Sequence, residues 1–174
     1  MKELILGGVR SGKSRLAETR ARQSLHEVIY LATASAGDDA GLRQRIREHR
    51  ERRPAHWVLA EEPVGLAAAL RRHCADHRCV LVECLTLWLT NLLCASDSEL
   101  FARERQAFME ALPGLPGQII LVSNETGLGI VPIGELTRRF VDEIGRLHQD
   151  LARICDRVIF TVAGLPHFLK GGSA

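Results

Sequence analysis

A glycine-rich segment near the start of this chain leaves few folds open to it. Eight consecutive residues fit the pattern GxxxxGK[ST] in full: Gly7, Gly8, Val9, Arg10, Ser11, Gly12, Lys13 and Ser14. The segment follows a short apolar run and opens a helical pattern, which is the strand–loop–helix context that the motif requires. Backbone N–H groups at such a helix start bind phosphate oxygens. We therefore predict a nucleotide-binding P-loop, with Lys13 reaching the β- and γ-phosphates and Ser14 a ligand of Mg²⁺.

Short apolar runs alternate with helical patterns along the rest of the chain. Strands are predicted at 3–6, 28–32, 57–60, 80–82, 118–122 and 158–162, and helices at 13–24, 39–52, 64–76, 86–94, 99–112 and 134–155. This order predicts an α/β fold in one domain over 1–174, a P-loop NTPase-like three-layer sandwich with a mostly parallel central sheet. The strand at 57–60 could run in either direction. We expect residues 166–174 to form a mobile, glycine-rich tail without a role.

Composition narrows the class of protein. The 174 residues are 46% hydrophobic and 25% charged, with a formal net charge of +2, which is typical of a folded protein and too small to predict nucleic-acid binding. The chain shows no signal peptide and no apolar stretch that approaches a membrane span, so a cytoplasmic location is expected. The five cysteines are odd in number and include no CxxC pair, which favours reduced thiols over disulfides or a zinc site.

Polar residues follow several predicted strands. They occupy positions 7–14, 33–35, 61–62, 83 and 124–125. Ligands bind at the carboxyl ends of strands in such sheets, so these positions are expected to share one crevice. Glu83 ends an apolar run and is a candidate partner of Mg²⁺, with a solvated strand end as the alternative. Residues 124–132 form either a plain turn or a segment that acts on the substrate, as a lid over it or as a surface that contacts it.

An arginine-rich helix is predicted after the second strand. Residues 39–53 contain six arginines and one histidine, His49. Arg45, Arg52 and Arg53 lie four residues before, three after and four after His49, so they could share its face. Neighbouring cations disfavour protonation of an imidazole, and a neutral imidazole is a nucleophile. The plainer alternative is an exposed surface helix with a solvated histidine.

Several blocks of the chain together resemble a known family. They are 7–14, 30–34, 45–54 with Trp57 and Glu61, 83–92 and 122–132. In order and spacing they resemble the bifunctional adenosylcobinamide kinase/adenosylcobinamide-phosphate guanylyltransferase family of cobalamin biosynthesis. The resemblance extends from residue 4 to about residue 162, nearly the whole chain.

The resemblance implies two reactions. The γ-phosphate of GTP or ATP would pass to the aminopropanol hydroxyl of adenosylcobinamide, with Mg²⁺ as cofactor. A histidine would then attack the α-phosphorus of GTP, and the GMP would pass to adenosylcobinamide phosphate, giving adenosylcobinamide-GDP. That histidine corresponds to His49, with His56 as its nearest competitor. The family also implies a homotrimer.

The same matching implies a set of nucleotide contacts beyond the P-loop. They are Ala32, Thr33, Ala34, Arg50, Glu51, Arg52, Arg53, Glu61 and Glu83. A carboxylate can accept two hydrogen bonds from a guanine edge, a role that suits Glu61.

Two other functions compete with this one. A P-loop small-molecule kinase would have no covalent intermediate, and a regulatory module would bind nucleotide without turnover. A switch GTPase is disfavoured because the chain lacks NKxD, and its DxxG letters at 38–41 do not directly follow a strand.

Overall fold

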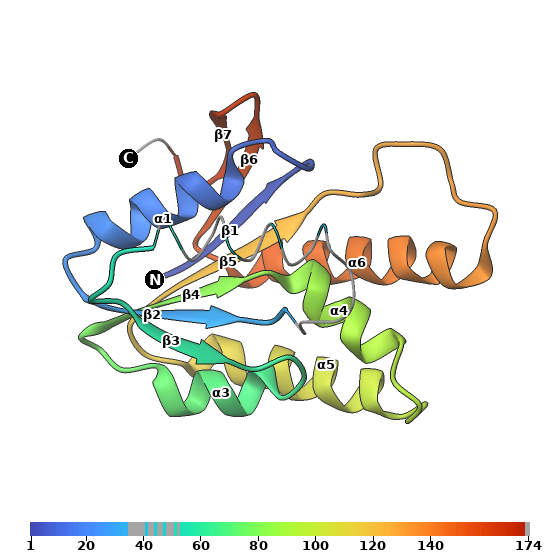
Figure 1. The fold of residues 1–174 in the computed structure, drawn as a ribbon, viewed down its shortest axis with the longest axis horizontal. Helices are drawn as coiled ribbons and strands as arrows, with labels where there is room; N and C mark the ends of the chain where they lie inside the picture. Colours follow the sequence, from blue (N-terminus) through green and yellow to red (C-terminus); the bar gives the residue numbers. More distant parts are fainter. Residues whose placement is uncertain (35–40, 42–43, 45–46, 48–50, 52, 173–174) are drawn as a thin grey trace.

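A single twisted sheet forms the centre of the molecule (Figure 1). The structure, a computed structural model, describes residues 1–34, 41, 44, 47, 51 and 53–172. The described elements are β1 (Lys2–Gly7), α1 (Lys13–Gln23), β2 (Glu27–Ala32), β3 (Val58–Glu61), α3 (Leu66–His73), β4 (Arg78–Glu83), α4 (Leu85–Leu93), α5 (Leu100–Ala111), the 3₁₀ turn η1 (Leu112–Gly114), β5 (Gln118–Asn124), α6 (Glu135–Ile154), β6 (Arg157–Val162) and β7 (Leu165–Lys170).

The order of the strands places β1 inside the sheet. Within the described residues the order is β3-β2-β4-β5-β1-β6-β7, and β1 to β6 all run parallel. β1 pairs with β5 on one side and β6 on the other, so Leu4 lies between Leu121 and Val158. Parallel strands buried on both faces read as continuous apolar runs, which is the pattern found in these segments. The loop that leaves β1 therefore emerges from the middle of the sheet's carboxyl edge.

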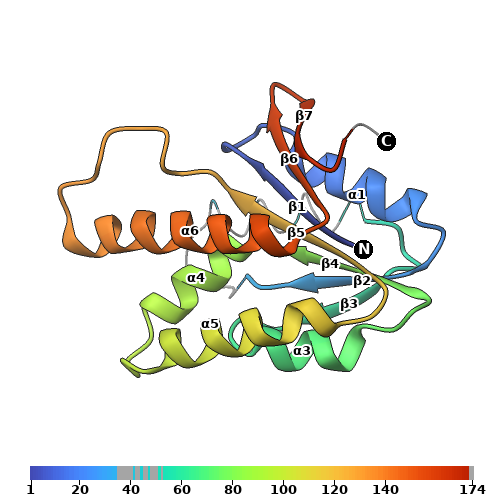
Figure 2. The same ribbon diagram turned by 180° about the vertical axis from the view of Figure 1, so that it is seen from behind.

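Helices cover both faces of the sheet. Figures 1 and 2 show α1 on one face and α3, α4, α5 and α6 on the other. Alternate strand residues feed two separate cores, as the period of two in a strand requires: Leu4, Ile119 and Leu121 face the four-helix side, whereas Ile5, Ile120 and Val122 face α1. On the four-helix side the rings of Trp88 and Phe108 meet edge to face, with centroids 5.3 Å apart.

Helix α1 packs closely against the sheet through small residues and is joined to it by an ion pair. Ala17 and Ala21 are fully buried, which lets the helix lie close to the strands. Near its end, Arg20 pairs with the buried carboxylate of Glu3 on β1, and Arg157 of β6 donates to the same carboxylate at 3.0 Å. Burial raises the pKa of Glu3, although the charge of Arg20 opposes this. The pairing satisfies a carboxylate that would otherwise be costly inside the protein.

The structure confirms the predicted fold class and most of the predicted elements. All six predicted strands are present, and five of the six helices agree with their predicted ranges to within a few residues. The sixth, at 39–52, lies mostly outside the described residues; of its members 41, 44, 47 and 51 are described, and they are helical and exposed. The 57–60 segment, whose direction was open, forms β3 and runs parallel to β2.

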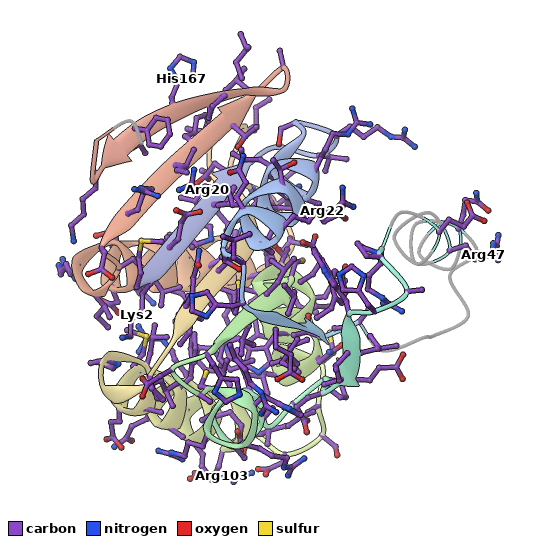
Figure 3. All side chains as sticks on the ribbon, turned by 90° about the vertical axis from the view of Figure 1, so that its left-hand side faces the viewer. Lys2, Arg20, Arg22, Arg47, Arg103 and His167 are labelled. Carbon is purple, nitrogen blue, oxygen red and sulfur yellow. The ribbon has the colours of Figure 1, made fainter. Side chains whose placement is uncertain are left out.

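The prediction for the C-terminal residues was wrong. Leu165–Lys170 forms β7, which pairs antiparallel with β6 and completes one edge of the sheet. Figure 3 shows the labelled His167 on this outer strand. The two strands are joined through Ala163 and Gly164, which have φ values of 51° and 81°. Positive φ at two successive residues is the signature of a tight two-residue hairpin turn.

Within the part of the chain that the structure describes, no helix is both long enough and apolar enough to cross a membrane.

Candidate nucleotide-binding site

The glycine-rich segment forms a tight loop between β1 and α1. Gly12 is the residue that precedes α1, and its φ of 95° lies in the left-handed region that favours glycine. The Ser11 amide donates to the Gly8 carbonyl at 3.2 Å, and the Gly164 amide donates to the Ser11 carbonyl at 2.8 Å. The loop is thus closed on itself and supported by the β6–β7 turn. The first backbone amides of α1 lie at the end of this loop, which is where a phosphate group would bind.

Lys13 lies across this loop. It is the first residue of α1, and it is buried although it carries a charge. Its Nζ donates to the Gly8 carbonyl at 3.2 Å, so the ammonium lies over the loop. An ammonium in this place is positioned to meet phosphate oxygens bound by the same loop.

Ser14 and Glu83 join the loop to the neighbouring strand end. The Ser14 hydroxyl donates to Glu83 Oε1 at 2.8 Å, although the two residues are 69 positions apart. A hydroxyl and a carboxylate are oxygen ligands of the kind that Mg²⁺ prefers, with phosphate and water completing its shell. In the described part of the chain no three His, Cys, Asp or Glu side chains gather as a metal cage. A cation held by two protein oxygens and the nucleotide fits this donor set.

The carboxyl edge of the sheet turns several predicted site residues toward α1. Glu83 pairs with Ala32 on β2, and Ala32 pairs with Glu61 on β3. On β5, Asn124 pairs with Gly7, the first residue of the loop. Ile120 and Val122 face the α1 side, so alternation places Asn124 on that side as well. The strand ends thus bring these described residues to one edge of the sheet.

Thr33 connects two of these strand ends. It is fully buried, its hydroxyl donates to the Cys84 carbonyl at 2.7 Å, and the Cys84 amide donates back to the hydroxyl at 2.9 Å. The Thr33 amide also donates to the Glu83 carbonyl at 2.9 Å. Asn91 of α4 donates to the Thr33 carbonyl at 2.9 Å. These bonds fix the backbone that carries Glu83.

Three more predicted contacts lie at or near the β2–β3 side. Arg53 is half-buried, with its guanidinium 5.2 Å from the centre of the Tyr30 ring. Ala34 is half-buried beyond β2, and Glu61 is exposed at the end of β3.

Of the predicted arginine-rich helix, the described residues Glu51 and Arg47 are exposed, and Figure 3 shows Arg47 away from the sheet. His49, Arg50 and Arg52 lie outside the described residues.

A comparison of two loop glycines tests the backbone of the site. We expect Gly12→Ala to lower the free energy of unfolding by about 1–2 kcal/mol, because an L-residue is strained in the left-handed region. A Cβ there would also lie 3.0 Å from Gly164 Cα. Gly8→Ala is the matched control, since its Cβ would have nothing within 4 Å. Urea denaturation without nucleotide measures both, and equal losses would contradict the strain argument.

A buried polar cluster beneath β5 was not predicted. His148 of α6 and Ser123 of β5 are buried, and His148 Nε2 is 2.8 Å from Ser123 Oγ. His148 Nδ1 is 3.6 Å from Glu125 Oε2. The sequence held one signal for it: His148 follows Ile144 and precedes Leu151 at the spacing of a buried helix face.

Fold and site together define the class of protein. A mostly parallel sheet in which an inner strand leads into a glycine-rich loop, a lysine and a helix is the architecture of P-loop nucleotide-binding proteins. Solved structures of similar fold include an ATPase of the type III secretion system (TM-score 0.51, 13% identity, covering 91% of this chain and 50% of that one). The flagellar accessory protein FlaH of Methanocaldococcus jannaschii has a TM-score of 0.50 and 16% identity, covering 99% of this chain and 80% of that one.

Sequence comparison identifies the family. The family described as cobinamide kinase/cobinamide phosphate guanyltransferase matches residues 3–169, and the chain belongs to it. The bifunctional adenosylcobalamin biosynthesis protein CobP of Pseudomonas aeruginosa is 62% identical over 171 residues, 98% of each chain. The bifunctional adenosylcobalamin biosynthesis protein CobU of Salmonella typhimurium is 39% identical, covering 93% of this chain and 96% of that one. These matches confirm the family, and with it the class of enzyme, that the sequence blocks predicted.

Proposed function

We propose that this protein phosphorylates the aminopropanol hydroxyl of adenosylcobinamide and then transfers GMP from GTP to the resulting phosphate. The observation that carries the proposal is the Ser14–Glu83 hydrogen bond of 2.8 Å beside the buried Lys13. It joins a phosphate-binding loop and a carboxylate from another strand in one place. Membership of the cobinamide kinase/cobinamide phosphate guanyltransferase family supports the choice of substrates.

The first step is phosphoryl transfer from GTP or ATP. The hydroxyl oxygen of adenosylcobinamide attacks the γ-phosphorus, the bond to the β–γ bridging oxygen breaks with its electron pair leaving on the diphosphate, and the hydroxyl proton passes to solvent. The loop amides and Lys13 bind the phosphate oxygens as negative charge moves onto the leaving diphosphate. Ser14 and Glu83 would hold Mg²⁺, which would neutralise phosphate charge when bound.

The second step is guanylyl transfer through a histidine. A bare nitrogen of His49 attacks the α-phosphorus of GTP and releases pyrophosphate. A phosphate oxygen of adenosylcobinamide phosphate then attacks the same phosphorus, which frees His49 and gives adenosylcobinamide-GDP. The arginines near His49 in the sequence would favour the neutral imidazole if they share its helix face, because nearby cations oppose protonation. The remaining proposed nucleotide contacts are Ala32, Thr33, Ala34, Arg50, Glu51, Arg52, Arg53 and Glu61. We also propose that the protein works as a homotrimer.

The mass of the intact protein tests the proposal. After incubation with Mg²⁺ and GTP, without cobinamide, we expect the protein to gain the mass of one GMP. Addition of adenosylcobinamide phosphate should then remove the adduct and release adenosylcobinamide-GDP. A sample that binds GTP but gains no mass would contradict the covalent step and favour a plain P-loop kinase.

A further inference from the structure

The cluster beneath the end of β5 links α6 to the edge of the nucleotide site. Ser123 Oγ lies 2.8 Å from His148 Nε2 and 3.4 Å from the Thr86 hydroxyl of α4. The Thr86 hydroxyl in turn accepts the Asn124 amide at 2.8 Å. Three elements, β5, α4 and α6, therefore meet in one buried polar network directly below the residues that adjoin the P-loop.

The chemistry of the neighbours determines which nitrogen of His148 carries the proton. His148 is 6% exposed, and its Nδ1 faces Glu125 Oε2 at 3.6 Å, with no shorter hydrogen bond to any residue that the structure describes. A carboxylate can only accept, so the proton belongs on Nδ1 and Nε2 accepts the Ser123 hydroxyl. Burial lowers the pKa of His148, although Glu125 opposes this, which favours the neutral ring.

Glu125 connects this histidine with the P-loop. Its amide donates to the Gly7 carbonyl at 3.0 Å, which ties the residue to the first position of the loop. Its Oε1 accepts the Gly127 amide at 2.6 Å, so the same carboxylate shapes the chain that follows. Its Oε2 is the oxygen that faces His148. Glu125 is therefore held from three sides at the point where the chain leaves the sheet.

The segment that begins at Glu125 is apolar and exposed. Figures 1 and 2 show it arching outward from the end of β5 to the start of α6. Leu128, Ile130, Val131 and Ile133 are between 70% and 98% exposed. The far end is held by Arg138, whose Nη1 donates to the Ile133 carbonyl at 2.6 Å. Exposed apolar side chains gathered in one segment mark a surface that contacts a ligand or another protein chain.

We propose that His148 is a positioning residue for the acceptor substrate: by holding Glu125, it fixes residues 126–134 beside the P-loop, where they contact the large, alkyl-substituted ring of the acceptor. This inference rests on the proposed function. The acceptor is the partner favoured, because Ser14 and Glu83 meet on the α1 side of the sheet, whereas Ser123 points to the opposite face. Apolar side chains also suit a ring carrying alkyl groups better than they suit phosphate.

The test separates use of the acceptor from use of the nucleotide. His148→Leu removes both ring nitrogens, so Glu125 loses the ring that it faces and the buried Ser123 hydroxyl loses its partner. We expect the KM for adenosylcobinamide in the phosphorylation step to rise about tenfold, the effect of leaving one buried polar group without its partner. The rate at which GTP alone labels the protein should stay within about threefold of the wild type, since that step needs no acceptor. His148→Asn keeps a donor near Glu125 and should recover much of the acceptor KM.

Two further variants keep the test decisive. Leu151→Ala removes another buried side chain of α6 and should destabilise the fold without changing the acceptor KM. Glu125→Ala removes the other partner and should reproduce the His148→Leu result, so it carries the test if His148→Leu does not fold. An unchanged acceptor KM, or equal losses in acceptor use and labelling, would overturn the inference. Absence of labelling in the wild type would instead refute the proposed covalent step, while the acceptor KM would still report on His148.

Discussion

Replacement of Lys13 by alanine should reduce both half-reactions by about 10²–10³-fold, the loss observed when one preorganised group is removed from a developing negative charge. Lys13 is buried at the start of α1, with its Nζ 3.2 Å from the Gly8 carbonyl in the phosphate-binding loop. Phosphoryl transfer leaves charge on a diphosphate, and guanylyl transfer leaves charge on pyrophosphate. Both leaving groups occupy the same loop in the proposed scheme, so one ammonium serves both steps.

The measurement needs both activities from one preparation. Phosphorylation of adenosylcobinamide reports the first step, and the mass gained from GTP alone reports the second. Lys170→Ala is the matched control, because Lys170 is an exposed lysine whose Nζ donates to the Ala152 and Arg153 carbonyls at the end of α6. It should leave both rates unchanged. If Lys13→Ala retained either activity within about tenfold of the wild type, the single-site scheme would have to be abandoned.

The parts of the fold that were predicted correctly depend on local sequence. Buried parallel strands are continuous apolar runs, and the P-loop is eight consecutive residues. Each can therefore be predicted from its own segment, because no contact with a distant residue has to be known. The position of Glu83 at the end of β4 was also predicted locally, because it ends an apolar run. Its hydrogen bond to Ser14 then follows from the sheet order, in which only β5 separates β4 from β1.

The parts that were missed depend on contacts between distant residues. β7 is an exposed edge strand that contains Pro166 and is flanked by glycines, so its own sequence resembles a loop. It is a strand because it pairs with β6 across a turn in which Ala163 has a positive φ, a conformation that alanine rarely takes. His148 and Ser123 lie 25 residues apart on different elements; the spacing of His148 along α6 indicates that it is buried but does not indicate its partner.

Replacement of His49 by alanine should separate the two activities of the enzyme. We expect the GMP adduct to disappear, because no nitrogen remains to attack the α-phosphorus. Phosphorylation of adenosylcobinamide should persist within about tenfold, since in that step the acceptor hydroxyl attacks the γ-phosphorus directly and needs no protein nucleophile. Intact mass after incubation with GTP and the rate of adenosylcobinamide phosphorylation measure the two outcomes.

His56→Ala is the control that makes the result specific to one histidine. His56 is exposed in the turn before β3, and its loss should leave both activities in place. An adduct that survived in His49→Ala but vanished in His56→Ala would move the nucleophile to His56. Equal loss of both activities in His49→Ala would make His49 a nucleotide-binding residue, because a group needed only for covalent transfer cannot slow a reaction that lacks the covalent step.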